Sequence, residues 1–418
     1  MDIVIKGAAI WSGDDATTTV GDVRIRGREI IAVSPGSGAL SQGDAIVVDG
    51  EGQTLIPGLV EGHGHLSFNN FSSYWEMLDM PPEENLLVTL ENAKTYLDAG
   101  FTSVYSAGTV KLRLEVVVRN AVDAGRWPGP RIRACSPTIT TTGGLNDERR
   151  LHETRMLTSM VADGPDEMRR VVRLAAREGN DNIKLNMTGD DDGIPTIASN
   201  KTTMIDSEVE AAMSAAKSLG KSICAHTRTS ESVQMALRHG CDVLYHVDLV
   251  DEKTLDLMEA AKERIFVGPG LAFFHEALQL PPGSGFGMDR VAASMENSVR
   301  ITKELRRRGI RVVIGGDYGT VLTPHGTNAR DIAHLVNYGG YTPAEALKCA
   351  TVNGGLIMMP EGKLGRVAPG YLADLLLVKG DPLKDLSLLA SKENFSAILK
   401  DGKIHRAERA GSSLNIAA

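Results

Sequence analysis

The sequence predicts an α/β protein: a (β/α)8 TIM barrel with a small β-sandwich domain formed from the N- and C-terminal segments. Segments that read as helices alternate with brief apolar strands from residue 57 to about 366, and this alternation is typical of the βα units of a barrel. The first and last fifty residues instead read as short strands broken by Gly and Asp turns. We therefore expect a composite β-sandwich domain over 1–56 and 367–418 and a barrel over 57–366.

Each element is predicted from its own local pattern. The terminal strands alternate apolar with polar residues or carry β-branched runs, over 2–11, 21–34, 45–58, 370–380 and 395–407. Helices that end at Gly, a common C-terminal stop, are predicted over 84–100, 166–179, 206–220 and 296–309. The apolar strands that follow these helices are 101–108, 181–189, 221–227 and 310–317. A chain of 418 residues is long for one domain, but α/β barrels reach such lengths.

Composition narrows the class of partner. A formal net charge of −8 argues against nucleic acid or an anionic membrane as the main partner. The four cysteines are scattered without a C-x-x-C motif, which suits a reducing compartment. We see no signal peptide and no apolar run of about 20 residues that would span a membrane. We expect a cytoplasmic homo-oligomer.

Polar residues end or interrupt several of the predicted barrel strands. In a barrel, the carboxyl ends of the strands form the active-site mouth, and an unpartnered charge or imidazole there is costly. His63 and His65 stand one residue apart, so both side chains point to the same face of a strand. The full set of such residues is His63, His65, Lys184, His226, His246 and Asp317.

Neutral imidazoles and carboxylates are ligands of Zn²⁺ and related divalent ions. Four histidines and one aspartate exceed the needs of one tetrahedral ion, so two ions fit better. Two ions close together need a bridging anion, and no Glu stands at a predicted strand end to supply it. Lys184 does stand there, between Ile183 and Leu185, where an unpaired ammonium is disfavoured. The alternative is an ordinary ion pair between Lys184 and Asp190 or Asp191.

The order His-x-His, Lys, His, His, Asp resembles the amidohydrolase superfamily, and the stretch 317–383 is similar to the C-terminal signature of that superfamily. The resemblance covers essentially the whole chain and is greatest to the imidazolonepropionase and Xaa-Pro-dipeptidase-like branch. It implies that His63, His65 and Asp317 hold a first metal ion and that His226 and His246 hold a second. It further implies that Lys184 reacts with carbon dioxide to form a carbamate bridging both ions, which we expect to be zinc.

This assignment predicts a hydrolase of small molecules that cleaves a C–N bond of the amide type. Two metals produce a hydroxide from a bridging water and polarise the substrate carbonyl. Asp317 takes the proton from the water and passes it to the leaving nitrogen, so Asp317 and Lys184 are the expected catalytic residues. A dipeptidase, a carbamate or urea hydrolase and a phosphotriesterase remain alternatives with the same centre. A deaminase would need Glu where Thr229 stands, and a non-catalytic relative would be expected to have lost ligands.

Three places in the sequence, two of which depart from the pattern of the relatives, bear on the identity of the substrate. Relatives carry a histidine directly after a Thr-Gly-Gly, where this chain has Leu145, so we expect Gly143 and Gly144 to border the substrate. Arg228 follows the strand-five histidine and is expected to hold a substrate carboxylate; the alternative is solvent or a pair with Glu231. His325 either touches the substrate or braces its loop.

Two loops, 68–82 and 269–287, are rich in aromatic, Leu and Met side chains. They suggest an apolar substrate moiety, or else simple packing. The expected substrate is an amide-bonded compound with an apolar or aromatic part: an N-acyl amino acid, a peptide-like compound or a xenobiotic amide. The remaining histidines are expected to be structural or solvated: His152, His239, His275, His334 and His405.

Overall fold

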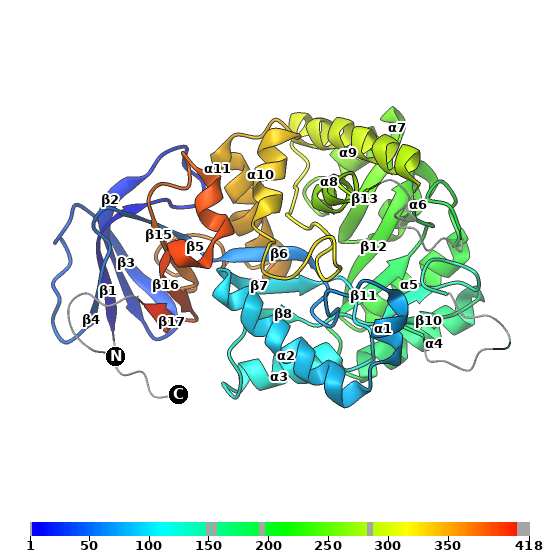
Figure 1. Ribbon diagram of the computed structural model, residues 1–418, viewed down its shortest axis with the longest axis horizontal. Coiled ribbons are helices and arrows are strands. Elements are labelled where there is room, and N and C mark those ends of the chain that lie inside the picture. The colour runs from blue at the N-terminus through cyan, green and yellow to red at the C-terminus, as the bar shows by residue number, and fades with distance from the viewer. Residues whose placement is uncertain (1, 148–151, 153–156, 192–196, 282–286, 408–418) are drawn as a thin grey trace.

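The computed structural model describes residues 2–147, 152, 157–191, 197–281 and 287–407 (Figure 1). Strands from both ends of the chain lie together at one side of the molecule, and the helices and parallel strands of the central segment fill the other side. Residues 408–418 of the predicted terminal domain lie outside the described residues.

The terminal strands form an eight-stranded sheet within the described part of the chain, in the order β17-β16-β15-β5-β1-β2-β3 with β4 paired to β1. Strand β15 lies antiparallel to β5, with Leu376 opposite Ile56, and β5 in turn runs parallel to β1. The two ends of the chain therefore share one sheet, as predicted. Its strands are β1 (Ile3–Ile10), β2 (Thr19–Arg26), β3 (Glu29–Pro35), β4 (Ile46–Asp49), β5 (Gln53–Pro57), β15 (Leu375–Lys379), β16 (Phe395–Lys400) and β17 (Lys403–Ala407).

The central segment contributes two parallel sheets to the described structure, in the orders β6-β7-β8 and β10-β9-β11-β12-β13-β14. Because parallel strands need a crossover, helices separate most of them in the chain. The strands are β6 (Leu59–Gly64), β7 (Phe101–Ser106), β8 (Arg131–Arg133), β9 (Thr138–Thr140), β10 (Ser159–Val161), β11 (Asn182–Asn186), β12 (Ser222–Thr229), β13 (Val243–Leu249) and β14 (Phe266–Gly268).

Residues 310–317, predicted as a strand, are not a regular strand. Only a bridge between Val312 and Val267 is present in this segment. The segment nevertheless joins the two parallel sheets, because Val267 N donates to Arg311 O at 2.9 Å and Gly62 N donates to Ile314 O at 3.0 Å. The regular pattern stops at a Gly-Gly pair, followed by an aspartate with φ of +61°.

The four predicted helices are present, with glycine after each in the left-handed region, where it carries no Cβ penalty. The last is α9, which begins eight residues earlier than predicted. The α-helices are α1 (Tyr74–Asp79), α2 (Pro82–Asp98), α3 (Leu114–Asp123), α4 (Gly164–Arg177), α5 (Asp206–Ser218), α6 (Ser230–His239), α7 (Glu252–Ala260), α8 (Leu271–Ala277), α9 (Met288–Arg308), α10 (Arg330–Asn337), α11 (Pro343–Lys348) and α12 (Gly354–Met358). The shorter elements are a π-helical turn (Cys349–Asn353) and two 3-10 helices (Leu386–Ala390, Lys392–Asn394).

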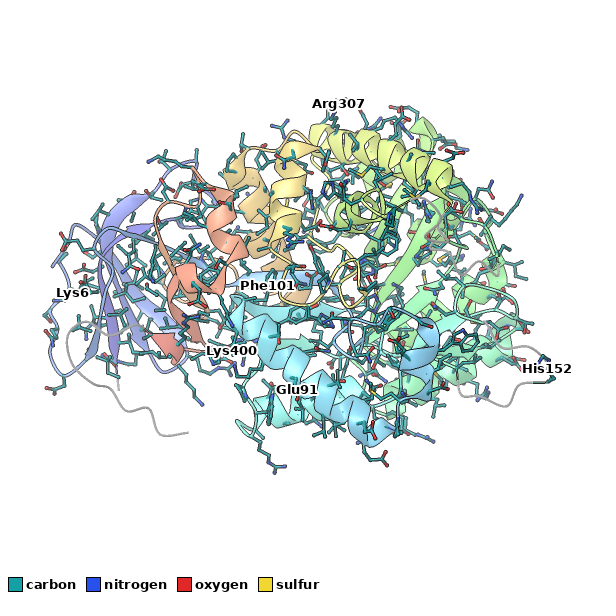
Figure 2. All side chains as sticks on the ribbon, in the orientation of Figure 1. Lys6, Glu91, Phe101, His152, Arg307 and Lys400 are labelled. Carbon is teal, nitrogen blue, oxygen red and sulfur yellow. The ribbon has the colours of Figure 1, made fainter. Side chains whose placement is uncertain are left out.

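The apolar side chains of the terminal sheet belong to two clusters, and the larger one, which includes Ile56 and Leu376, is shared with the central segment. The smaller cluster joins β1, β2, β5, β15 and β16, with Ile5, Leu55 and Leu399 fully buried. The larger cluster fills the space between the parallel strands and their helices. In Figure 2, Phe101 of β7 lies inside the molecule, whereas Glu91 of α2 and Arg307 of α9 lie on outer faces. Among the described residues, no helix combines the length and the apolar character needed to cross a membrane.

Candidate metal centre

His63 and His65 lie at the carboxyl end of β6 and converge on Asp317. His65 Nε2 is 2.9 Å from Asp317 Oδ1, and His63 Nε2 is 3.5 Å from the same oxygen. The other ring nitrogen of His65, Nδ1, is 3.0 Å from Gly108 O, which accepts a hydrogen bond and fixes the ring orientation. The three residues that the resemblance assigns to the first ion therefore lie together in the structure.

The backbone at this point is strained. Asp317 has φ of +61° and His246 has φ of +71°, both in the left-handed region that non-glycine residues rarely adopt. Such conformations cluster at functional sites, where the surrounding structure holds them in place. Gly315 is needed for a different reason, because a Cβ there would lie 2.4 Å from the Cβ of His63. The absence of a side chain lets the two segments meet.

His226 of β12 and His246 of β13 form a second histidine pair on adjacent strands. Their ring centroids are 4.6 Å apart. His226 Nε2 is 3.2 Å from Gly189 O and 3.6 Å from Asp190 Oδ2. His246 also lies near the first pair, with its ring centroid 5.4 Å from that of His63. The two pairs therefore belong to one site.

Lys184 of β11 lines the same cavity as the two histidine pairs and is only 3% exposed. Its backbone N donates to Ser136 Oγ at 3.1 Å. Its ammonium lies 4.6 Å from the centroid of the Tyr245 ring, which in turn stacks on His63 at 3.7 Å. Within the described residues, no carboxylate forms an ion pair with Lys184.

Burial sets the protonation of the imidazoles. It lowers the pKa of His63 and of His246 well below the ordinary value, and it also lowers the pKa of His226. Removal from bulk water opposes ionisation of Asp317, but the facing His63 and His65 outweigh it and hold its pKa well below the usual range. Neutral imidazoles around an ionised carboxylate are the protonation states that a divalent cation requires.

Glu61 supports the first pair from behind. This fully buried carboxyl accepts a hydrogen bond from His63 N at 2.8 Å and another from Asn328 Nδ2 at 2.8 Å. Burial raises the pKa of Glu61 to about 8. Glu61 thus fixes the backbone of His63 without facing the cavity.

The donor atoms fit a divalent metal. Two groups of three donors each have all their ligand atoms within 4.8 Å: His63, His246 and Asp317, and Asp190, His226 and His246. His63 Nδ1 and His246 Nδ1 are buried without a hydrogen-bond partner among the described residues, so a ligand would satisfy them. Asp190 was not predicted as a donor. The available signal was its position four residues after the end of β11, directly after the predicted strand 181–189.

A cavity of about 70 Å³ lies at this site. All six predicted ligands line it, together with Asp190 and residues that include Phe68, Thr138, Leu145, Asn146 and Asn186. Gly143 and Gly144 are not among its lining residues in the described structure. Gly143 forms an exposed turn, with its N donating to Asp147 Oδ2 at 2.9 Å. The neighbouring Leu145 and Asn146 border the cavity in their place.

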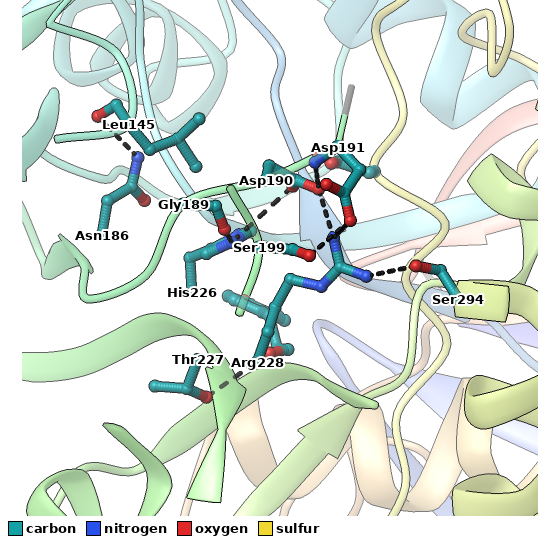
Figure 3. A network of polar contacts seen from close by, with 12 residues as sticks. Leu145, Asn186, Gly189, Asp190, Asp191, Ser199, His226, Thr227, Arg228 and Ser294 are labelled. Atoms are coloured by element: carbon teal, nitrogen blue, oxygen red, sulfur yellow. Dashed lines mark hydrogen bonds and ion pairs between the residues drawn. The ribbon is translucent and has the colours of Figure 1, made fainter. Parts of the chain in front are cut away.

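Arg228 of β12 is fully buried in a network of carboxylates (Figure 3). Its Nε and Nη2 donate to the two carboxylate oxygens of Asp248 at 2.8 and 2.6 Å. Its Nη1 donates to Asp190 Oδ1 at 2.5 Å, and its Nη2 also donates to Ser294 Oγ at 2.7 Å. The guanidinium lies 5.3 Å from the centroid of the Phe274 ring.

This network corrects two expectations. Arg228 neither points to solvent nor pairs with Glu231, because its donors are taken by buried partners. It is not placed at an open mouth where a substrate carboxylate would meet it. Asp190 and Asp191 pair with Arg228, Asp191 at 3.6 Å, so the alternative ion pair with Lys184 is wrong. The sequence could not show this, because the network depends on how β11, β12, β13 and α9 come together.

His325 braces a loop. Its Nε2 lies 2.9 Å from Phe68 O, its Nδ1 lies 3.2 Å from the Tyr96 hydroxyl, and burial lowers its pKa to about 4. His325 is not among the residues that line the cavity. Of the two alternatives, the bracing role fits this geometry.

The loop 68–82 is divided between the cavity and the core. Phe68 stacks on His65, with ring centroids 4.3 Å apart, and lines the cavity. Phe71 and Met77 instead pack into a small apolar cluster with Val110 and Leu114. The described part of loop 269–287 packs Phe274 against Arg228, and residues 282–286 of that loop lie outside the described residues.

The chain is similar to several known hydrolases. The ochratoxinase of Aspergillus niger is 24% identical over 377 residues, which cover 84% of this chain and 75% of that enzyme. The imidazolonepropionase of Alkaliphilus metalliredigens is 20% identical over 416 residues, covering 92% and 90% of the two chains. A crystal structure of a Xaa-Pro dipeptidase with bound methionine in the active site has a TM-score of 0.87 at 25% identity, covering 97% of this chain and 100% of that chain.

The family model of the amidohydrolases matches residues 54–405, which is most of the chain. With these neighbours, the chain has a TIM-barrel-type fold with an additional domain. It is a hydrolase that acts on C–N bonds, its family typically uses a divalent metal, and candidate ligand groups are present in the structure. By its sequence, its fold and its strand-end donors, the chain belongs to the amidohydrolase family.

Proposed function

We propose that the chain is a binuclear amidohydrolase in which His63, His65 and Asp317 hold one ion and His226 and His246 hold the second. Lys184, as its carbamate, bridges the two ions, and zinc is the expected metal. The observation that carries the proposal is that all six predicted ligands line a single cavity. A carbamate also resolves the position of Lys184, because an anion bridging two cations replaces a buried ammonium without a carboxylate partner.

The two ions, when bound, supply an activated water and polarise the carbonyl of the substrate. Asp317 is ionised at neutral pH and faces the donors, so it can accept the proton of the attacking water. It then donates that proton to the leaving nitrogen, which leaves poorly as an anion. Gly108, through its hydrogen bond to His65, keeps the ring next to Asp317 in one orientation.

We propose an amide-bonded substrate with an apolar or aromatic part: an N-acyl amino acid, a peptide-like compound or a xenobiotic amide. Phe68 and Leu145 supply apolar walls beside the donors. Two relatives are an ochratoxinase and a Xaa-Pro dipeptidase, and the second name denotes an enzyme of a peptide-like compound. Asn146 and Asn186 line the cavity and are the candidates to contact polar groups of the substrate, in place of Arg228.

The proposal includes the finer architecture. We propose that the parallel strands close into a (β/α)8 barrel over 57–366, with 310–317 as its eighth member, and that 1–56 and 367–418 form a β-sandwich domain. The hydrogen bonds that β14 and β6 donate to the carbonyl oxygens of Arg311 and Ile314 support closure. We further propose a cytoplasmic homo-oligomer; Cys135, Cys224, Cys241 and Cys349 are free and buried, which suits a reducing compartment.

The test is elemental analysis of the purified protein combined with a substrate screen. The screen contains N-acyl amino acids, their carboxamides, dipeptides, aryl amides, ureas, carbamates and phosphotriesters. We expect divalent metal in active protein, loss of activity on chelation, and turnover of amides above the other classes. Activity in metal-free protein would refute the metal assignment. Turnover confined to ureas, carbamates or phosphotriesters would keep the centre and reject the amide.

A further inference from the structure

A second group of metal-binding side chains lies outside the cavity, between α8 and α10. His275 and Glu276 belong to α8 and His334 belongs to α10, and the two helices pack against each other (Figure 1). One ligand atom from each of the three residues lies within 4.8 Å of the others. None of the three lines the cavity described above.

His334 is a buried polar side chain without a partner. It is 7% exposed, and both ring nitrogens are buried with no hydrogen-bond partner among the described residues. An imidazole has one donor and one acceptor in its neutral form. Leaving both unsatisfied in the interior is costly, and buried polar groups in native proteins are nearly always satisfied. His334 therefore indicates a missing ligand.

His275 is oriented toward His334. Their ring centroids are 4.6 Å apart. His275 Nδ1 lies 2.8 Å from the hydroxyl of Tyr338, one turn after His334 on the same helix side. A metal-binding histidine typically has its second ring nitrogen held by a hydrogen bond, which fixes the tautomer and the ring orientation. In the tautomer in which Nδ1 donates to the Tyr338 oxygen, Nε2 of His275 carries the lone pair that a metal requires.

Glu276 supplies a carboxylate to the group. Its Oε1 lies 3.4 Å from Arg330 Nη1. This contact does not block a metal, because a carboxylate has a second oxygen and the Arg330 side chain is 51% exposed and can turn to solvent. Two imidazoles, a carboxylate and a water complete a four-coordinate zinc ion.

We propose that His275, Glu276 and His334 form a second divalent-metal site that ties α8 to α10. Donors at about 2.1 Å from one tetrahedral ion lie about 3.4 Å apart, and the three ligand atoms lie within 4.8 Å of one another, so the group closes around an ion with side-chain shifts of about 1 Å. The site would also position α8 relative to the cavity. Helix α8 begins after Gly270, where a Cβ would lie 2.8 Å from His246 Nδ1. Fixing α8 thus fixes the element that lies against His246.

The test counts Zn²⁺ ions bound per chain by titration calorimetry of the chelator-treated, full-length protein. Wild type is compared with His275→Gln, Glu276→Gln and His334→Gln. His239→Gln is the matched control, because His239 also contacts a carboxylate, Asp206 at 3.1 Å, but is not in a donor group. We expect one Zn²⁺ fewer per chain in the three variants and no change in the control. The comparison is a difference, so it holds whatever the number of ions in the cavity.

A thermal melt gives an independent readout. Added Zn²⁺ should raise the melting temperature of wild type more than that of His275→Gln, in which the replaced side chain is partly exposed and folding is least at risk. Unchanged stoichiometry in His275→Gln and Glu276→Gln would overturn the proposal, even if His334→Gln failed to fold. If wild type binds the ion of this site but no ion in the cavity, the proposed function is rejected and the site between α8 and α10 stands.

Discussion

Lys184 and Arg228 are two buried cations on the adjacent strands β11 and β12, and their surroundings are opposite. Arg228 contacts Asp190, Asp191 and Asp248, so its charge is more than neutralised. Lys184 has only the face of an aromatic ring, and no carboxylate pairs with it among the described residues. A buried charge is stable only when it is paired and hydrogen-bonded.

This difference distinguishes a buried cation that stabilises the fold from one that takes part in the chemistry of the site. The Arg228 guanidinium makes four hydrogen bonds, to Asp190, Asp248 and Ser294, so Arg228 holds the strands and loops together. A lysine that is buried without a partner either loses its charge or reacts. The first residue is a structural element next to the centre, and the second is a candidate for the centre itself.

The largest expected effect is that of Lys184→Met. Removal of the bridging group should cost one bound metal and lower turnover by about 10⁴-fold, since metal stabilisation of a transition state is worth several kcal/mol. Metal content and kcat measure this directly. Lys184→Arg sharpens the comparison, because it keeps the charge over the Tyr245 ring but cannot act as the same carbamate. If Lys184→Arg retains wild-type activity, then Lys184 is a structural cation like Arg228.

Asp317→Asn should have the next largest effect. It should lower kcat by about 10²–10³-fold, because the amide cannot accept the proton that a general base must take. Much of the metal should remain, since the four histidines are untouched. Measurement of kcat and of metal content on the same preparation separates the two roles. Loss of both ions with the activity would show that Asp317 acts mainly as a ligand.

Arg228→Met should act on stability rather than on substrate choice. Breaking the network leaves Asp190 and Asp248 buried without their cation, which should lower the free energy of unfolding by about 3–5 kcal/mol. Urea unfolding measures this loss. The kcat/KM values for an N-acyl amino acid and for its carboxamide should change by the same factor. A selective rise in KM for the carboxylate would return Arg228 to the substrate site.

The sequence could predict that the ligands lie together, because this prediction needs only the local strand pattern and one rule of barrel architecture. Alternation in a strand fixes the face of His63 and His65, and the carboxyl ends of parallel strands meet at one edge. Arg228 was misplaced because its partners come from three other elements, whose distances no local pattern contains. Asp190 was missed because an acidic run after a strand usually reads as solvated loop.

The histidines on helices show the same limit. His275 and His334 were expected to be structural or solvated, since neither ends a strand. Their proximity depends on the packing of α8 against α10, which the periodicity of each helix does not specify. The segment 310–317 was predicted as a strand from its apolar run, and the Gly-Gly-Asp sequence that ends the run interrupts regular pairing.

The smallest expected effect concerns buried carboxyl groups, one paired with a cation and one without an ion-pair partner among the described residues. Asp248 is paired with Arg228, whereas the buried Asp331 has no ion-pair partner among the described residues and accepts a hydrogen bond from Gly315 N at 2.7 Å. Burial raises the pKa of Asp331 to about 6. A raised pKa means that the folded state binds the proton more tightly than the unfolded chain, so this contribution to stability is complete below about pH 4. It is lost as the pH rises through about 6.

Asp331→Asn should therefore gain stability relative to wild type as the pH rises. Between pH 5 and pH 7.5 we expect the difference in free energy of unfolding to move by about 1 kcal/mol in favour of the variant, measured by urea unfolding. Asp98→Asn is the control with opposite sign. Despite partial burial, His405 and Lys94 lower the pKa of Asp98 to about 2, so that variant should be less stable than wild type across the same range. If the free energies of unfolding of Asp331→Asn and wild type change in parallel with pH, Asp331 is ionised in the folded state. The fold would then hold a buried carboxylate without an ion-pair partner.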